Sequence, residues 1–310
     1  MENIADKQVS KMTAELHPAL QFLIFICLFA GIWLLGNLIG AGIVLGVYGM
    51  KMIDAISTVN GTYPGFITAM WILQLLSTTI PVFATPIIFS RFIVRNTSEY
   101  IKPGFKFSWL LMVIVFIIMF FSSPFLEFLV NINQKMQLPP FLHWMRDMQD
   151  QMDKLQGVLL QMNTIWSMLF DLIYVGLLTA IAEEFMFRGV MQTIFEKWFN
   201  NKHAAIWVTA ILFSAFHMEF FGFLPRMMLG VLFGYFVVYS GSIWPAVLGH
   251  FINNGTDVVI TYLYQRKQID IAPDDQHVFN NTAYIISFII TLFLFWVYHK
   301  VATNKKPVHV

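Results

Sequence analysis

The sequence predicts an all-α, polytopic membrane protein with about eight transmembrane helices and one amphipathic helix at the membrane interface. Of its 310 residues, 57% are hydrophobic and 12% are charged, whereas a soluble domain carries about 25% charged residues. The mean hydropathy is +0.66. Several apolar stretches also reach the roughly 20 residues that a membrane span requires. We therefore expect an integral membrane protein.

Eight apolar segments are the candidate spans. Four are long, at 20–48, 66–90, 108–130 and 160–186, and four are shorter or less apolar, at 204–220, 222–240, 244–263 and 280–299. The first eighteen residues are polar and carry both signs of charge, unlike a cleaved signal peptide, so the first span is expected to be retained. We divide the chain into N-terminal spans with an outer amphipathic segment (1–157), central helices that carry polar motifs (158–263), and a last span with a basic tail (264–310).

The charge distribution excludes nucleic acid as a partner and favours one orientation in the membrane. The net charge is +1, and no basic run exceeds the lysine pair of the tail, so no extended positive surface attracts nucleic acid. With a cytoplasmic N-terminus, the cytoplasmic segments hold eleven basic residues: Lys7, Lys11, Arg91, Arg95, Lys102, Lys106, Lys197, Lys202, Lys300, Lys305 and Lys306. The opposite loops hold six: Lys51, Lys135, Arg146, Lys154, Arg266 and Lys267. This bias predicts that both termini are cytoplasmic, and we expect the plasma membrane of a prokaryote.

An amphipathic pattern follows the third span, in FLHWMRDMQDQMDKLQGVLLQM at 141–162. Its apolar residues recur at helical spacing with acidic and basic residues between them, which is typical of a helix lying on the membrane surface. It is either a lid or substrate platform, or a connector resting on lipid. A second amphipathic piece is at 191–203. The one cysteine, Cys27, lies in the first span, where we expect it to pack against lipid or core.

Two adjacent glutamates and an arginine stand at the end of the fourth span, in AEEFMFRG. A charge at the middle of the bilayer costs about 2.5 to 3.5 kcal/mol, so ionisable residues there are functional candidates. Residues four apart share a helix face, whereas neighbouring residues point in different directions. We predict that Glu184 stacks on Arg188, as a structural or supporting ion pair. Glu183 then points elsewhere and needs another partner.

Later spans supply that partner. His217 ends the motif FSAFH, with Phe213 one helical turn earlier. His250 and Asn254 are four residues apart in WPAVLGHFINNG and therefore share a helix face. A single histidine in such a segment is more often a satisfied core residue than a catalyst. Two histidines and an unpaired acid together form a set of the kind that can act in catalysis.

The set fits hydrolysis without a metal or a covalent nucleophile. A carboxylate beside an imidazole, Glu183 with His217, can hold a water and remove its proton as it attacks a carbonyl. A second imidazole and an amide NH₂ group, His250 with Asn254, can donate hydrogen bonds to the developing oxyanion. The rival chemistry uses Glu183, His217 and His250 as zinc ligands, although no short-spaced ligand pair of the HExxH kind is present. Serine catalysis is weaker, because the sequence lacks GxSxG.

The ordered motifs EExxxR (Glu183, Glu184, Arg188), FxxxH (Phe213, His217) and HxxxN (His250, Asn254) resemble the CAAX protease and bacteriocin-processing family of intramembrane glutamate endopeptidases. The likeness covers roughly residues 165 to 262. The resemblance implies an eight-span helical bundle with a conical cavity, a cytosol-facing site and no metal cofactor. It also implies that Glu183 and His217 activate water, that His250 with Asn254 forms the oxyanion site, and that Glu184 and Arg188 are supporting.

The predicted function is hydrolysis of a peptide bond in or next to the membrane, on a peptide or membrane-protein substrate with or without a lipid anchor. One alternative is a non-catalytic scaffold or immunity protein of the same family. Another is a polytopic transporter, which would need polar residues along a through-path. Glu127 and Asp171 are further acids in the spans, either near the interface or functional.

One geometric point goes against the set if the helices are straight and upright. If the fourth span ends near Arg188, Glu183 is shallow, whereas His250 is about 9 Å deep and His217 about 20 Å deep at 1.5 Å per residue. Strong tilt, a fourth helix that continues past Arg188, or a sunken start to the fifth span would each bring the groups together.

Overall fold

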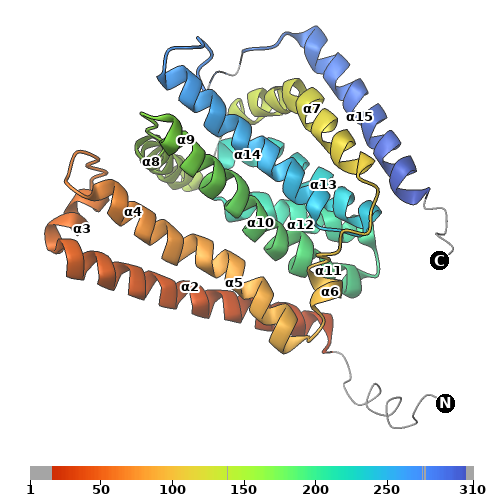
Figure 1. Ribbon diagram of the computed structural model, residues 1–310, viewed down its shortest axis with the longest axis horizontal. Helices are drawn as coiled ribbons and strands as arrows, with labels where there is room; N and C mark the ends of the chain where they lie inside the picture. The colour runs from red at the N-terminus through yellow and green to blue at the C-terminus, as the bar shows by residue number, and fades with distance from the viewer. Residues whose placement is uncertain (1–15, 138, 274, 276, 305–310) are drawn as a thin grey trace.

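The computed structural model describes residues 16–137, 139–273, 275 and 277–304. Within these residues the chain forms helices and connecting segments, with no strand. Figure 1 shows long helices that run roughly side by side, with α2, α4 and α5 forming an arm along one edge. The predicted all-α fold is confirmed.

The N-terminal arm is a helical hairpin. The first helix, α2 (Pro18–Tyr48), is followed by the short α3 (Met50–Ser57), and a second long helix returns through α4 (Phe66–Gln74), π-helical η1 (Leu75–Thr79), α5 (Ile80–Ile88) and π-helical η2 (Phe89–Ile93). The two helices approach closely at Gly36, where a Cβ would lie 2.0 Å from the carbonyl oxygen of Leu76. Only glycine fits this contact.

The next segments are a long helix that packs against the last helix of the chain and an amphipathic helix. After the one-turn α6 (Thr97–Tyr100) comes α7 (Leu110–Gln134), which packs against the last helix, α15 (Asn281–Thr303). The short 3₁₀ turn η3 (Pro140–Leu142) leads into α8 (His143–Leu159). The amphipathic helix predicted at 141–162 is thereby confirmed as a helix, and none of the residues of α8 is fully buried.

The central helix is continuous for 35 residues, from Ile165 to Phe199. It consists of α9 (Ile165–Asp171), π-helical η4 (Leu172–Leu178), α10 (Thr179–Glu184), π-helical η5 (Phe185–Met191) and α11 (Gln192–Phe199). Thr164 begins it with a capping box that includes Ser167, which satisfies amide groups of the first turn. Two π-helical stretches therefore flank the two glutamates, and such segments are frequent at functional sites.

Three more helices complete the bundle before α15. They are α12 (Lys202–Phe216), α13 (Phe223–Ser240) and α14 (Trp244–Gln265), with the 3₁₀ turn η6 (Phe220–Gly222) between the first two. Asn201 caps α12 by accepting from the amides of His203 and Ala204. Gly241, with a φ of 70°, ends α13 in the left-handed region, a conformation that favours glycine.

Six helices of the described residues are long and apolar enough to cross a membrane: Pro18–Tyr48, Phe66–Ile93, Leu110–Gln134, Ile165–Phe199, Phe220–Ser240 and Asn281–Thr303. The other two predicted spans are also helical, but α12 has only 15 residues and α14 carries polar residues along its length. All eight predicted segments are therefore helical in the described residues, and six of them meet the criterion for a span. The chain is an integral membrane protein.

Two buried apolar clusters hold the helices together. One joins α7, α13, α14 and α15 around Phe236, Val237 and Tyr298. The other joins α2, η5, α11 and α12 around Phe25, Phe187 and Ile194. Cys27 is exposed on α2, as expected for a residue packed against lipid.

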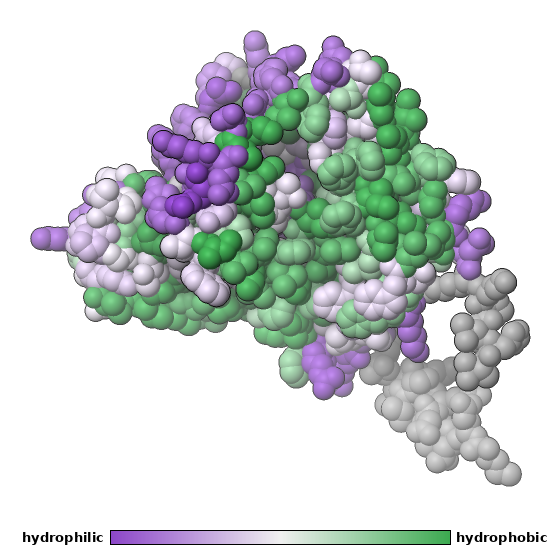
Figure 2. Space-filling view, turned by 45° about the horizontal axis from the view of Figure 1, so that its top comes forward, coloured by the Kyte–Doolittle hydropathy of each residue, from purple (hydrophilic) through white to green (hydrophobic). Residues whose placement is uncertain are grey.

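The bundle has two ends that matter for the site. We call the end with α3, α8 and η6 the α8 end, and the end with α6, α11 and the turn at 241–243 the α11 end. At the α11 end, Ile243 N donates to the carbonyl of Lys102 at 3.0 Å, and Thr193 bonds Lys102. Figure 2 shows that hydrophilic residues gather at the upper left, where α8 lies, beside a hollow, whereas hydrophobic residues cover much of the side of the molecule.

Candidate active site

The central helix places the two glutamates on different faces. Glu184 and Arg188 are fully buried, and Arg188 Nη1 donates to Glu184 Oε1 at 2.7 Å. The predicted stacking of this pair is therefore confirmed. Glu183 points away from the pair, with 13% of its side chain exposed.

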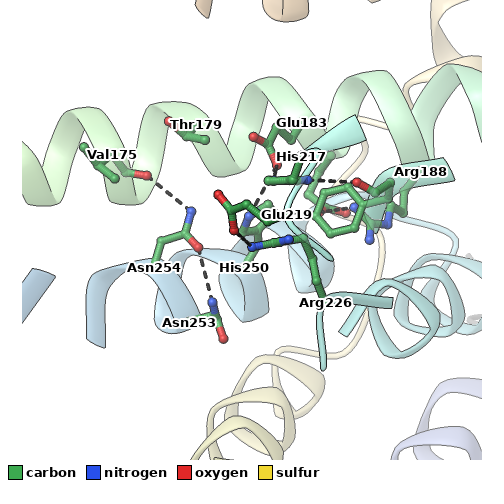
Figure 3. A network of polar contacts seen from close by, with 12 residues as sticks. Val175, Thr179, Glu183, Arg188, His217, Glu219, Arg226, His250, Asn253 and Asn254 are labelled. Atoms are coloured by element: carbon green, nitrogen blue, oxygen red, sulfur yellow. Dashed lines mark hydrogen bonds and ion pairs between the residues drawn. The ribbon is translucent and has the colours of Figure 1, made fainter. Parts of the chain in front are cut away.

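Glu183 meets two histidines from two other helices (Figure 3). Its Oε2 atom lies 3.8 Å from Nε2 of His217 and 3.7 Å from Nε2 of His250. Both distances exceed that of a direct hydrogen bond, and Glu183 Oε2 is buried without a hydrogen-bond partner. A buried acceptor of this kind calls for a water or a substrate group.

His217 stands at the end of α12, and the helix orients its ring. Its Nδ1 atom lies 2.8 Å from the carbonyl oxygen of Phe213, four residues earlier. A carbonyl can only accept, so Nδ1 carries the proton. The other ring nitrogen, which faces Glu183, is therefore an acceptor whenever the imidazole is neutral.

His250 is oriented by the second glutamate. Its Nδ1 atom lies 2.8 Å from Glu184 Oε1, and its side chain is 6% exposed. The same carboxylate oxygen accepts from Arg188, so one buried acid joins the arginine to the histidine. This contact directs Nε2 of His250 toward Glu183.

Two phenylalanines frame these charges. The Phe213 ring lies 5.0 Å from the ring of His217 and 5.8 Å from that of His250, and the Arg188 guanidinium sits 4.1 Å above its centre. Phe233 stacks on His250 with ring centres 5.5 Å apart. Phe213 thus supports both histidines by packing and one of them through its carbonyl.

Asn254 lines the same cavity, and its side chain hydrogen-bonds to Val175 and Asn253. Its Nδ2 donates to the carbonyl oxygen of Val175 at 3.3 Å, and its Oδ1 accepts from Asn253 at 3.3 Å. Val175 lies in π-helical η4, where the i→i+4 ladder is interrupted. Asn254 therefore supplies a hydrogen bond to the irregular stretch of the central helix.

An unforeseen ion pair lies beside the histidines. Arg226 of α13 bonds Glu219, which follows His217 by two residues. Asn253 and Asp257 of α14 also line the cavity. The sequence does contain a signal for these two residues, because Asn253 and Asp257 are four residues apart and therefore share a helix face. Glu127, one of the further acids in the spans, also lines the cavity and accepts from Tyr284 and from the amide of Phe279.

Glu183, His217 and His250 lie at similar depths in the bundle because the central helix does not end near Arg188. It continues to Phe199, so Glu183 stands sixteen residues from its end, or about 24 Å at 1.5 Å per residue. His217 stands fifteen residues from Lys202, about 22 Å by the same rise. The start of α14 lies deeper than assumed, since Ser242 and Ile243 are buried beneath the segment that contains Lys102 and Gly104.

The four predicted catalytic residues line one cavity of about 800 Å³. Its wall includes apolar side chains of α2 and η4, and its rim includes Met152, Leu155, Gln156 and Leu159 of α8. The volume suits a short extended segment or a drug-sized molecule. The cavity is therefore large enough for a small molecule or a short peptide segment to reach Glu183, His217 and His250.

The donor geometry bears on the zinc alternative. Within the described part of the chain, no group of three or more His, Cys, Asp or Glu side chains has the arrangement of a metal site. The donor types themselves, two imidazoles and a carboxylate, are those of known zinc enzymes. Chelation is the test that separates the two chemistries.

Comparison with known proteins finds a family model that is similar to this segment. Residues 165–256 match the family model described as type II CAAX prenyl endopeptidase Rce1-like. The uncharacterized protein YpbD of Bacillus subtilis is 27% identical over 111 residues, which are 34% of this chain and 52% of the relative. The alignment thus spans about half the length of that curated relative. No solved structure gives a significant match. The resemblance to the CAAX protease family is confirmed over residues 165–256, which contain the central helix with both glutamates, both histidines and Asn254.

Proposed function

We propose that this protein is an intramembrane peptidase in which Glu183 and His217 activate a water for attack on a peptide bond. The observation that carries the proposal is the meeting of Glu183 with two histidines from separate helices, at 3.8 and 3.7 Å, inside one cavity. The match to a CAAX endopeptidase model supports the reaction class.

The first step uses the gap between Glu183 and His217. A water placed beside both can donate one hydrogen bond to Glu183 Oε2 and one to the acceptor nitrogen of His217. The Phe213 carbonyl holds the proton of His217 on the far nitrogen. As the water oxygen bonds to the carbonyl carbon, Glu183 takes its proton and later passes it to the leaving amine as the C–N bond breaks.

The second histidine stabilises the oxyanion. His250 can donate from Nε2 only when both ring nitrogens carry protons, because Nδ1 already faces the Glu184 carboxylate. The Glu184 carboxylate holds Nδ1 and thereby points Nε2 toward the position of the oxyanion.

Asn254 has a second donor for the same oxyanion. Its NH₂ group has two hydrogens, and the Val175 carbonyl takes one. The other is free to meet the substrate once the peptide lies beside His250. Glu184 and Arg188 act by orienting His250, and Phe213 acts by orienting His217.

The test compares membrane peptides from cells that carry the wild type, Glu183→Gln or Glu127→Gln. Glu127 lines the same cavity but is hydrogen-bonded to Tyr284 and Phe279, which makes it a matched control. We expect fragments made by the wild type and the Glu127→Gln variant to be absent with Glu183→Gln. A Glu183→Gln variant that leaves both the peptides and the biological effect unchanged would support the scaffold alternative instead.

A further inference from the structure

One face of α14 forms a polar wall of the cavity. The residues of α14 that line the cavity recur every three or four positions and therefore share a helix face: His250, Asn253, Asn254, Asp257 and Val258. His250 stands beside Glu183, and Asp257 lies further along the helix, toward the α8 end. At 1.5 Å per residue, His250 and Asp257 are about 10 Å apart along the helix axis. The wall therefore leads from the catalytic groups to another carboxylate.

Negative charge exceeds positive charge around this carboxylate. Arg226 is the one Lys or Arg among the described residues that line the cavity, and it bonds Glu219 (Figure 3). Asp257 lies within electrostatic range of Arg226, but no ion pair within the described part of the chain includes Asp257. Two carboxylates therefore share one guanidinium group, which leaves a net charge of one negative unit on this part of the wall.

A molecule in the cavity can reach the Asp257 carboxylate, because this residue is exposed and lines the cavity. Asn253, one helical turn earlier, donates its NH₂ group to Asn254 Oδ1 at 3.3 Å (Figure 3). The carbonyl oxygen of Asn253 remains an acceptor. A carboxylate and an amide oxygen on one helix face can both accept from an ammonium or guanidinium group. The donor and acceptor types of this part of the wall therefore fit a cation.

Glu127 of α7 is another acid of the cavity, but protein donors already hold its carboxylate. Its Oε1 atom accepts from the hydroxyl of Tyr284 at 2.7 Å and from the amide of Phe279 at 3.1 Å. Asp257 has no such pair of donors among the described residues. Glu127 is therefore a matched control for Asp257, since it is an acid of the same cavity with its own hydrogen-bond partners.

The distance from His250 to Asp257 sets the position of a bound cation on the substrate. An extended peptide advances about 3.3 Å per residue, so about three residues cover the separation of about 10 Å along α14. We infer that Asp257, assisted by Asn253, is a specificity-determining residue that binds a cationic group of the substrate peptide about three residues from the cleaved bond. The group is a Lys or Arg side chain or a free α-amino group. The position relative to the cleaved bond rests on the proposed peptidase function, whereas the preference of the cavity for a cation does not.

Peptide binding to the Glu183→Gln protein tests this preference without hydrolysis. The protein is held in nanodiscs of zwitterionic lipid, so that lipid charge does not attract the peptides. The probes are three fluorescent octapeptide amides of alanine and leucine: an acetylated peptide with one central lysine, an acetylated peptide with norleucine in its place, and the norleucine peptide with a free amino terminus. Affinity is measured by fluorescence anisotropy, with empty nanodiscs as the blank. The further variants, each in the Glu183→Gln background, are Asp257→Asn, Asp257→Glu and the control Glu127→Gln.

We expect the lysine peptide or the free-amine peptide to bind about tenfold more tightly than the acetylated norleucine peptide, which is the effect of one hydrogen bond between charged groups. The cationic peptide that gains affinity identifies the group as a side chain or a terminal amine. Asp257→Asn should abolish the preference, whereas Asp257→Glu and Glu127→Gln should keep it. Equal affinities for the three peptides, no binding of any of them, or a preference that survives Asp257→Asn would overturn the inference.

The outcome is separable from that of the proposed function. If the preference is found but Glu183→Gln leaves the membrane peptides of cells unchanged, the cation site stands and the peptidase function fails. If fragments that depend on Glu183 are found but the cavity shows no preference for a cation, the peptidase function stands and the specificity of Asp257 fails.

Discussion

Replacement of Glu184 by Gln tests the buried charge cluster that orients His250. The change keeps the shape of the side chain and one carbonyl oxygen, but it removes the negative charge that lies 2.7 Å from Arg188 and 2.8 Å from His250. Both donors sit on the same oxygen, so both hydrogen bonds can persist in weaker, uncharged form. The variant therefore isolates charge from packing.

The expected loss follows from those two contacts. A hydrogen bond to a charged group contributes about 1 to 1.5 kcal/mol more than a neutral one, so two bonds give a loss of about 2 to 3 kcal/mol in the free energy of unfolding. Complete removal of one partner from a buried ion pair costs about 3 to 5 kcal/mol, so Glu184→Ala should lose more unfolding free energy than Glu184→Gln. Both variants should also reduce hydrolysis, Glu184→Ala more than Glu184→Gln, because His250 is then held by no hydrogen bond in the first variant and by a weaker one in the second.

The assay is reversible unfolding in mixed micelles, followed by circular dichroism, with Glu127→Gln as the control. Glu127 accepts from two neutral donors, Tyr284 OH at 2.7 Å and the Phe279 amide at 3.1 Å, so we expect a loss below about 1 kcal/mol. Equal stabilities for Glu184→Gln and Glu127→Gln would refute the reasoning, because the buried cluster would then contribute no more than a peripheral hydrogen bond.

Three further predictions concern the metal, the packing around Arg188 and the docking of α8. Treatment with a zinc chelator should leave hydrolysis unchanged, and a loss that added zinc restores would establish the zinc chemistry instead. Gly230→Ala should lower the free energy of unfolding by about 1 to 3 kcal/mol through overpacking, because its Cβ would lie 3.0 Å from Ala210 and 3.2 Å from Arg188 Nη2. The control Gly46→Ala, whose Cβ would have nothing within 4 Å, should be neutral. Equal effects of the two changes would contradict the packing around Arg188. Burial raises the pKa of Asp153 in α8, and the carboxylates of Glu219 and Asp150 raise it further. Protonation of Asp153 thus favours docked α8. The hydrogen-exchange protection of α8, corrected for intrinsic rates, should therefore increase as the pH falls through this raised pKa. The same pH dependence in Asp153→Asn would argue against this role of Asp153.

The sequence predicted the parts of the site that depend on helix periodicity. The stacking of Glu184 on Arg188 follows from their spacing of four residues, because such residues share a face. The separation of Glu183 from that pair follows equally from adjacency. The convergence of the histidines was predicted from chemistry and resemblance, since local spacing carries no information on contacts between separate helices.

The remaining features depend on long-range contacts that no local pattern encodes. The π-helical η4 exposes the Val175 carbonyl, and its partner is Asn254, 79 residues later. The pairing of Arg226 with Glu219 depends on the turn between α12 and η6, where Met218 has a positive φ of 56°. The extension of the central helix to Phe199 was one of three alternatives that the sequence left open, because 191–203 also fits a separate amphipathic piece.

The arrangement around Glu183 is the central claim, and a high-resolution experimental structure in lipid tests it most directly. The account predicts an ordered water within about 3.2 Å of both Glu183 Oε2 and His217 Nε2, with His250 Nε2 facing the same position. Side chains of Glu183, His217 and His250 separated beyond the reach of a shared water, in both free and peptide-bound states, would contradict the account.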